Sequence, residues 1–208
     1  MSVLSERREM RIGLSGGRTP AGVYRLLGTS PEFVDWSGAH FYFADERDAP
    51  PSEPESNYWM ARKLWFEPAG IPPDRVHRMK ADAADLEASA AEYDALLAQP
   101  LDLLVLGIGE DGHTASLFPG SRWLDERRRR VVPVYDSPKP PPRRLTITPR
   151  VIEEARDILV LAGGAEKAKA VAAALAEQGE VSRTPARLAR DRTWIVDEEA
   201  LTEWKRAR

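Results

Sequence analysis

The sequence of 208 residues contains no cysteine, and this absence excludes several kinds of protein. Disulfide bonds, thiolate zinc sites and cysteine nucleophiles all require that side chain. A strong excess of one charge is also missing, because 30 basic and 33 acidic residues give a formal net charge of −3. No overall electrostatic field therefore draws the chain to nucleic acid or to a membrane surface.

Long hydrophobic runs are missing as well. No apolar stretch approaches the roughly 20 residues of a membrane-spanning helix, so we expect no membrane span. The N-terminal stretch MSVLSERREM is charged and lacks the apolar centre of a signal peptide. These absences predict a cytoplasmic protein. The length and the 42% of hydrophobic residues suit one globular domain that covers residues 1–208.

Short apolar runs alternate with segments of helical spacing along the chain. The predicted strands are residues 11–15, 40–44, 101–106, 144–148, 158–162 and 193–196, with further candidates at 76–79 and 131–134. The predicted helices are residues 20–27, 57–65, 84–97, 165–177 and 198–204. Strands that alternate with helices predict a doubly wound α/β fold, with a mostly parallel sheet and helices on both faces.

The stretch LDLLVLGIGEDGHTASLFPG, residues 101–120, holds the densest group of reactive side chains. Its apolar start predicts a strand buried on both faces of a parallel sheet. Asp111 and His113 come just past the carboxyl end of that strand, where ligands bind in open α/β sheets. His113 is the natural general base, because an unperturbed histidine titrates near neutral pH. Residues 114–118 are expected to begin a helix whose N-terminus would favour an anion.

The same stretch contains a possible dinucleotide-binding motif. Gly107, Gly109 and Gly112 match G-x-G-x-x-G after a strand. That motif requires an acidic residue about 20 positions further on, where this chain has the basic run 127–130. We therefore predict no nicotinamide cofactor. No group of histidines, cysteines or carboxylates has metal-ligand spacing, so we predict no metal either.

A glycine-rich turn follows the first predicted strand. Thr19 is a favourable N-cap for the next helix, and Pro20 is a favourable first helical residue. A strand, a glycine turn and a capped helix present free backbone N–H groups to a phosphate. An ordinary strand-to-helix turn has the same pattern, and the G-K-[ST] ending of a P-loop is missing. The residues of this turn are Ser15, Gly16, Gly17, Arg18 and Thr19.

Further charged residues follow other predicted elements. Asp45 and Arg47 come directly after a strand, and Arg144 begins one. Lys167 lies in the first turn of a helix, where a cation opposes the helix dipole unless an anion is bound. The alternatives are a solvated turn with an internal ion pair at Asp45 and a solvated side chain at Lys167. Together with His113, these residues predict a site for a phosphorylated small molecule at one edge of the sheet.

Most of these residues lie in motifs that extend over nearly the whole chain from residue 11. The motifs are LSGGRTP (14–20), FADER (43–47), SN (56–57), LGIGEDGHTASLFPG (106–120), RRLTIT (143–148), GGAEKA (163–168) and WIVDEEAL (194–201). They resemble the 6-phosphogluconolactonase family. The resemblance implies a Rossmann-like single domain of the phosphosugar isomerase and deaminase type. It also implies hydrolysis of 6-phospho-glucono-1,5-lactone to 6-phosphogluconate in the pentose phosphate pathway, without metal or cofactor.

The resemblance assigns roles to the candidate residues. His113 would deprotonate the attacking water, and Asp111 would orient the imidazole or stabilise its charged form. Arg47 matches the family's active-site arginine, which holds the phosphate or stabilises the oxyanion. Asp45 more naturally supports the site than performs chemistry. The predicted substrate-binding residues are Ser15, Gly16, Gly17, Arg18, Thr19, Asp45, Gly109, Arg144 and Lys167.

The chain departs from the family pattern at two places. The family normally begins with a further strand and helix, whereas only about ten residues precede Arg11, so we expect this chain to lack them. The family often has a small hydroxyl residue where this chain has Arg18. That arginine would add a phosphate contact or point to solvent.

Two other functions compete with lactone hydrolysis. A glucosamine-6-phosphate deaminase of the same fold places a glutamate in a DGHxAxxEP pattern, where this chain has Phe118. A sugar-phosphate sensor would usually carry a DNA-binding module, for which the residues before Arg11 leave no room. We therefore expect a sugar-phosphate substrate, no nucleic-acid or membrane partner, and a monomer or weak homodimer.

Overall fold

The structure is a computed structural model that describes residues 9–30 and 34–208. Most of the N-terminal stretch that we compared with a signal peptide, residues 1–8, lies outside the described residues. None of the helices in the described ranges combines the length and the apolar character needed to cross a membrane.

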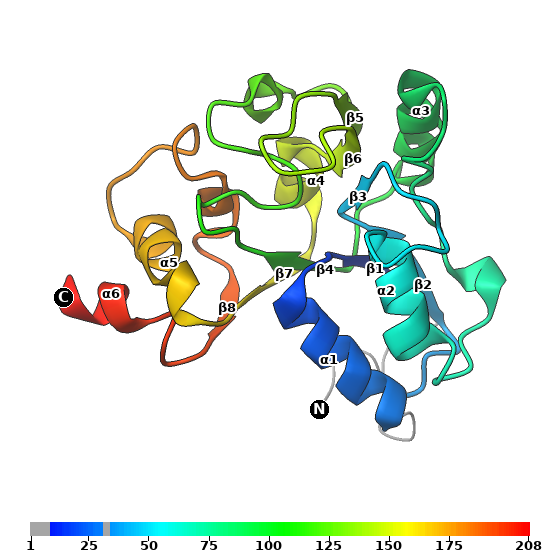
Figure 1. Cartoon of the computed structure of the whole chain (residues 1–208), viewed down its shortest axis with the longest axis horizontal. Coiled ribbons are helices and arrows are strands. Elements are labelled where there is room, and N and C mark those ends of the chain that lie inside the picture. The colour runs from blue at the N-terminus through cyan, green and yellow to red at the C-terminus, as the bar shows by residue number, and fades with distance from the viewer. Residues whose placement is uncertain (1–8, 31–33) are drawn as a thin grey trace.

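A five-stranded parallel sheet forms the centre of the molecule (Figure 1). All neighbouring strands in it are parallel, in the order β2-β1-β4-β7-β8. This sheet confirms the predicted α/β class, and each predicted long strand other than residues 144–148 belongs to it. Its strands are β1 (Met10–Leu14), β2 (Ala39–Phe43), β4 (Leu103–Gly107), β7 (Asp157–Ala162) and β8 (Thr193–Val196).

A second, antiparallel sheet of three strands was not predicted. It pairs β3 (Asp45–Arg47) with β6 (Arg144–Ile147), and β6 with β5 (Val131–Val134). The strand β3 could not be recognised from its charged sequence, because charged residues are usually exposed. Asp45 and Glu46 are buried in spite of their charge. The prediction of a half-buried strand at 144–148 is also wrong, since β6 is buried along its whole length.

Helices surround the two sheets. Figure 1 shows α1 and α2 beside β1 and β2, and α5 and α6 at the opposite edge, near β8. The helices are α1 (Arg18–Thr29), α2 (Asn57–Ala61) with its π-helical continuation Arg62–Phe66, α3 (Leu86–Leu96), α4 (Pro149–Glu154), α5 (Ala168–Leu175) and α6 (Thr202–Arg206). Short 3-10 turns cover Pro73–Arg75, Arg122–Asp125, Ala165–Lys167 and Pro185–Ala189.

Several local predictions are corrected by the backbone. Thr19 is not the N-cap of α1, because Gly17, at a φ of 110°, already turns the chain into the helix. Residues 114–118 form a turn with a bridge between Thr114 and Leu117, not a helix. Residues 76–79 contribute one isolated bridge from Val76 to Phe41 instead of a strand.

An aromatic cluster fixes α1 and α2 against the sheet. The rings of Tyr24 and Trp65 stack with 5.5 Å between their centroids, and Phe41 of β2 meets Trp65 edge-on at 5.0 Å. The Tyr24 hydroxyl donates a hydrogen bond to the backbone carbonyl of Ser15 at 2.8 Å. Core packing therefore holds the end of β1, where the glycine-rich turn begins.

Candidate active site

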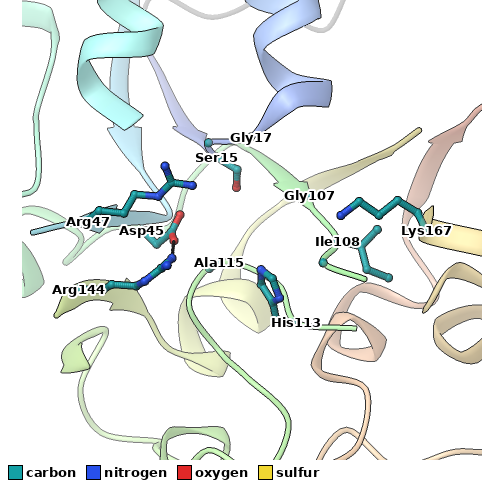
Figure 2. A pocket seen from close by; sticks show the side chains of 12 residues that line it. Ser15, Gly17, Asp45, Arg47, Gly107, Ile108, His113, Ala115, Arg144 and Lys167 are labelled. Carbon is teal, nitrogen blue, oxygen red and sulfur yellow. Dashed lines mark ion pairs between the residues drawn. The ribbon is translucent and has the colours of Figure 1, made fainter. Parts of the chain in front are cut away.

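A cavity of about 130 Å³ opens toward solvent at the carboxyl ends of β1 and β4. Chain-distant segments meet in it, as the sequence predicted for this edge of the sheet (Figure 2). The residues that line it are Ser15, Gly16, Gly17, Asp45, Arg47, Gly107, Ile108, Gly109, His113, Ala115, Arg144 and Lys167.

His113 and Asp111 form a hydrogen-bonded pair at this cavity. The distance from the imidazole Nδ1 to Asp111 Oδ1 is 2.5 Å. Partial burial alone would raise the pKa of the Asp111 carboxyl. The hydrogen bond and the charge of His113, with a smaller contribution from Lys139, outweigh burial and lower that pKa well below its usual range. Asp111 is therefore an ionised acceptor, and it fixes the orientation of the imidazole.

The backbone around the pair is shaped by glycine. The Gly109 N–H donates to the His113 carbonyl at 2.8 Å, and the Gly112 N–H donates to the Gly109 carbonyl at 3.0 Å. Gly112 has a φ of 84°, a conformation that favours glycine. These contacts form a tight loop that presents His113 to the cavity.

Residues after His113 pack against its ring. The Thr114 hydroxyl donates to the Gly107 carbonyl at 2.9 Å, and Ala115 has a φ of 48°. Residues 114–118 therefore do not supply the helix N-terminus that the sequence predicted there. Phe118 is buried and lies 4.7 Å from the imidazole, measured between ring centroids. One face of the His113 ring is therefore covered by an apolar side chain.

Asp45 is buried within a polar network on the other side of the cavity. Asn57 donates from Nδ2 to the Asp45 carbonyl at 2.9 Å and to its carboxylate at 3.1 Å. The Ser116 hydroxyl donates to Oδ2 of Asp45 at 2.6 Å, and Arg144 Nη1 lies 3.9 Å from the same oxygen. The carboxylate is thus oriented by three side chains, in keeping with a supporting role.

Two polar atoms at the cavity have no hydrogen-bond partner among the residues that the structure describes. They are the Ser15 hydroxyl oxygen and Nε of Arg47, and both are buried. Arg47 Nη1 donates to the Glu55 carbonyl at 2.9 Å, which holds its guanidinium in place. Figure 2 shows Ser15 and Arg47 facing the same part of the cavity. Buried polar groups without a partner are rare, and these two atoms are available to a polar ligand.

Arg144 also lines the cavity, but its donors are largely occupied. Its Nε and Nη2 donate to the carbonyls of Lys139, Pro140 and Pro141 at 2.9 to 3.1 Å. Its Nη1 donates to the Ser116 hydroxyl at 3.3 Å. The structure places this predicted phosphate ligand between Asp45 and a proline-rich loop, residues 136–142.

Lys167 points into the cavity from the opposite side (Figure 2). Burial is the main cause that lowers the pKa of its ammonium group, and the charge of Lys139 lowers it further, whereas Glu110 opposes both. Among the described residues, the Lys167 ammonium makes no hydrogen bond or ion pair. It remains available to an anion.

Arg18 and Thr19 do not reach this cavity. They line an adjoining one between the glycine turn and Gly164. Arg18 forms an exposed ion pair with Glu166 at 2.5 Å, so it neither enters the site nor points freely to solvent. Within the described ranges, no three His, Asp or Glu side chains are placed to hold a metal ion.

The sequence matches the family described as "Glucosamine-6-phosphate isomerases/6-phosphogluconolactonase" over residues 1–197. The chain belongs to this family. A 6-phosphogluconolactonase of Streptomyces coelicolor is 37% identical over 98% of this chain and 85% of its own length.

Solved structures of the glucosamine-6-phosphate isomerase/6-phosphogluconolactonase family agree with the fold. The 6-phosphogluconolactonase from Trypanosoma brucei is similar with a TM-score of 0.77 and 31% identity, over 92% of this chain and 84% of that chain. A monomeric glucosamine-6-phosphate deaminase is similar with a TM-score of 0.84 and 26% identity, over 96% and 90%. The overall fold therefore does not distinguish a lactonase from a deaminase. The residues of the site must distinguish them.

Sequence reasoning missed several residues that shape this family member's site. Asn57 was noticed as part of a motif without a role, and Ser116 was not singled out. Glu46 accepts hydrogen bonds from the backbone N–H groups of Asn57 and Tyr58, at the start of α2. Burial raises the pKa of the Glu46 carboxyl, although these hydrogen bonds oppose the shift. The charged residues that directly follow an apolar strand in the FADER motif were the available signal, since a carboxylate that becomes buried requires partners.

Proposed function

We propose that the protein is a 6-phosphogluconolactonase, which hydrolyses 6-phospho-D-glucono-1,5-lactone to 6-phospho-D-gluconate in the oxidative pentose phosphate pathway. The curated relatives at 34% to 37% identity carry that name. The observation that carries the proposal is the His113–Asp111 pair at a cavity that also holds Lys167 and Arg47. It combines a general base with cations for a phosphorylated substrate.

In the proposed mechanism, His113 activates water. Ionised Asp111 can only accept a hydrogen bond, so the neutral imidazole carries its proton on Nδ1 and has Nε2 free as the base. Nε2 takes a proton from water while the water oxygen attacks the lactone carbonyl carbon. The resulting oxyanion returns its electrons to the carbonyl, and the ester bond to the ring oxygen breaks. The imidazolium then protonates that oxygen, which restores the base and gives the open-chain acid.

Cationic and polar groups would hold the substrate. Lys167 is proposed to bind the phosphate, together with backbone N–H groups of residues 15–17. Arg47 is proposed as an anion contact, to the phosphate or to the oxyanion. The two roles separate kinetically, since loss of a phosphate contact raises KM and loss of an oxyanion contact lowers kcat. Arg144, Asp45 and Gly109 would position these groups.

We also propose one domain that acts in the cytoplasm, as a monomer or weak homodimer. The main hydrophobic cluster supports a single domain, because it joins Ile12 of the parallel sheet to Val131 and Leu145 of the antiparallel sheet. Arg18 and Thr19, at the adjoining cavity, are proposed to contribute to the phosphate site only through their backbone and through the ion pair with Glu166.

A coupled assay tests the proposed function. The lactone is supplied to the protein, and the formation of 6-phosphogluconate is followed with 6-phosphogluconate dehydrogenase above the rate of spontaneous hydrolysis. We expect an enzyme-dependent rate that His113→Ala removes. A rate equal to the no-enzyme rate at high protein concentration would contradict the proposal.

A further inference from the structure

The proline-rich loop beside the cavity is anchored by hydrogen bonds to its backbone. Arg144, which is 5% exposed, donates to the carbonyls of Lys139, Pro140 and Pro141. Ser137 adds two contacts, since its hydroxyl donates to the Lys139 carbonyl at 2.8 Å and accepts from the Lys139 N–H at 3.2 Å. The backbone of Lys139 is therefore fixed at the rim of the site.

The side chain of Lys139 extends back toward the reactive pair. Its Nζ lies 3.9 Å from Oδ1 of Asp111, the same oxygen that His113 contacts. This separation exceeds the 2.7–3.2 Å range of an N–H···O hydrogen bond by roughly 0.7 Å. The side chain is 41% exposed. Asp111 thus attracts the ammonium group without binding its donors.

The charge of Lys139 also acts on the ammonium group of Lys167. It lowers the pKa of Lys167, after the larger lowering by burial and the opposing charge of Glu110. Two ammonium groups that repel each other are stabilised when an anion binds to both. The lactone ring and the hydroxyl groups of the proposed substrate are neutral, so its phosphate is the group that such a pair can bind.

We infer that Lys139 is a further substrate-binding residue, which contacts the phosphate of the substrate together with Lys167. This inference rests on the proposed function for the identity of the substrate. Under this inference, two cations of one segment have different roles. Arg144 fixes the loop with its buried guanidinium, and Lys139 supplies the charge that reaches the ligand.

Binding of the reaction product tests the inference without turnover. Isothermal titration calorimetry with 6-phosphogluconate should show a Kd roughly tenfold higher for Lys139→Ala than for the wild type, which is the loss of one charge-assisted contact. Lys139→Arg keeps the charge and should lose less affinity. Unphosphorylated gluconate should bind the wild type and Lys139→Ala equally weakly.

Arg143→Ala is the matched control. Arg143 lies in the same segment and carries the same charge, but it pairs with Asp48 at 3.2 Å. An equal loss of affinity in Arg143→Ala and Lys139→Ala would mean that only the general charge of the loop matters, and it would overturn the direct contact. Unchanged binding in Lys139→Ala would also overturn the direct contact with the phosphate. The interaction of Lys139 would then be limited to Asp111.

The two proposals can fail separately. A wild type that hydrolyses the lactone while Lys139→Ala binds the product normally would disprove only the inference about Lys139. If the wild type bound glucosamine 6-phosphate and not 6-phosphogluconate, the proposed function would fail. The effect of Lys139→Ala on glucosamine 6-phosphate binding would then decide the role of Lys139. A wild type that bound neither phosphorylated probe would contradict both.

Discussion

The backbone of Gly109 lies so close to His113 that a Cβ atom at position 109 would be 2.0 Å from the imidazole Nδ1. The same atom would be 2.6 Å from Oδ1 of Asp111. The bare backbone of Gly109 thus makes room for the pair that we propose as the centre of catalysis. Gly109 is not among the described glycines with a positive φ, so its backbone conformation does not require glycine. The close approach of the His113 ring does.

Gly109→Ala should therefore displace the imidazole and lower kcat by about a hundredfold, the usual cost of moving a reactive group by about 1 Å. Gly22→Ala is a matched control, since a Cβ there meets no atom within 4 Å and position 22 lies inside α1. Kinetics of both variants in the coupled assay check the prediction. Equal activity of the two would show that the loop adapts and that the observed position of His113 is not needed.

Local sequence signals predicted the parallel sheet correctly, and they predicted that chain-distant segments meet at one edge of it. The apolar runs of β4 and β7 end in glycines, and such a pattern depends only on neighbouring residues. The cap of α2 can also be predicted locally, because serine is a favourable N-cap residue, and the Ser56 hydroxyl accepts from the Trp59 N–H at 3.2 Å. These features lie within a few residues of each other, so the sequence displays them directly.

Features that depend on distant residues were missed. The strand β3 consists of charged residues and becomes a strand only by pairing with Arg144–Ile147, about a hundred positions later. Residues 114–118 have suitable helix propensity, but the Ser116 N–H donates to the Thr146 hydroxyl, 30 positions later, and the chain makes a turn with Ala115 at a φ of 48°. Tertiary contacts override local preference in both cases.

His113→Ala should lower kcat by about a hundredfold to ten-thousandfold, because a general base is lost. The fold should remain intact, since the side chain contacts mainly Asp111 and Phe118 at the wall of a cavity. Steady-state kinetics and thermal unfolding of the same preparation check both statements. A variant with normal unfolding and near-normal kcat would remove His113 from the mechanism.

Lys167 and Arg144 should respond differently to truncation. Lys167→Ala should weaken substrate binding by about 1.5–3 kcal/mol and leave the free energy of unfolding unchanged, because its ammonium contacts no other described group. Arg144→Ala should lower the free energy of unfolding by about 3 kcal/mol or more, because Asp45 would stay buried without its cation. Urea unfolding and KM, measured on both variants, separate the effects. Equal stability of the two variants would contradict the structural role of Arg144.

His77 should make the protein less stable in acid. Burial, then the charges of His40 and Arg11, lower the pKa of His77 from its ordinary value of 6.5, while Asp74 opposes them. A base whose pKa is lowered in the folded state binds more protons when unfolded, so stability is complete above pH 6.5 and falls as the pH drops below it. Urea unfolding between about pH 7.5 and pH 5.5 measures this slope. His77→Gln should flatten it, and an unchanged slope would assign the acid sensitivity to other groups.

We expect no release of ammonia from glucosamine 6-phosphate, in spite of the similarity to a deaminase fold. That reaction must protonate a ring oxygen and move a proton between neighbouring carbons, which requires an acid within roughly 2.6–3.2 Å of those atoms.

The side chain beside the His113 ring is instead Phe118, at 4.7 Å between centroids, and it can neither donate nor accept a proton. Its buried ring would also remove water from a charged amine without replacing the lost hydrogen bonds. Asp45 is a poor substitute, because Asn57 and Ser116 already bind its carboxylate. An ammonia assay against a no-enzyme control checks the prediction. Turnover that disappears in His113→Ala would show that the site performs the deaminase reaction and would overturn the lactonase proposal.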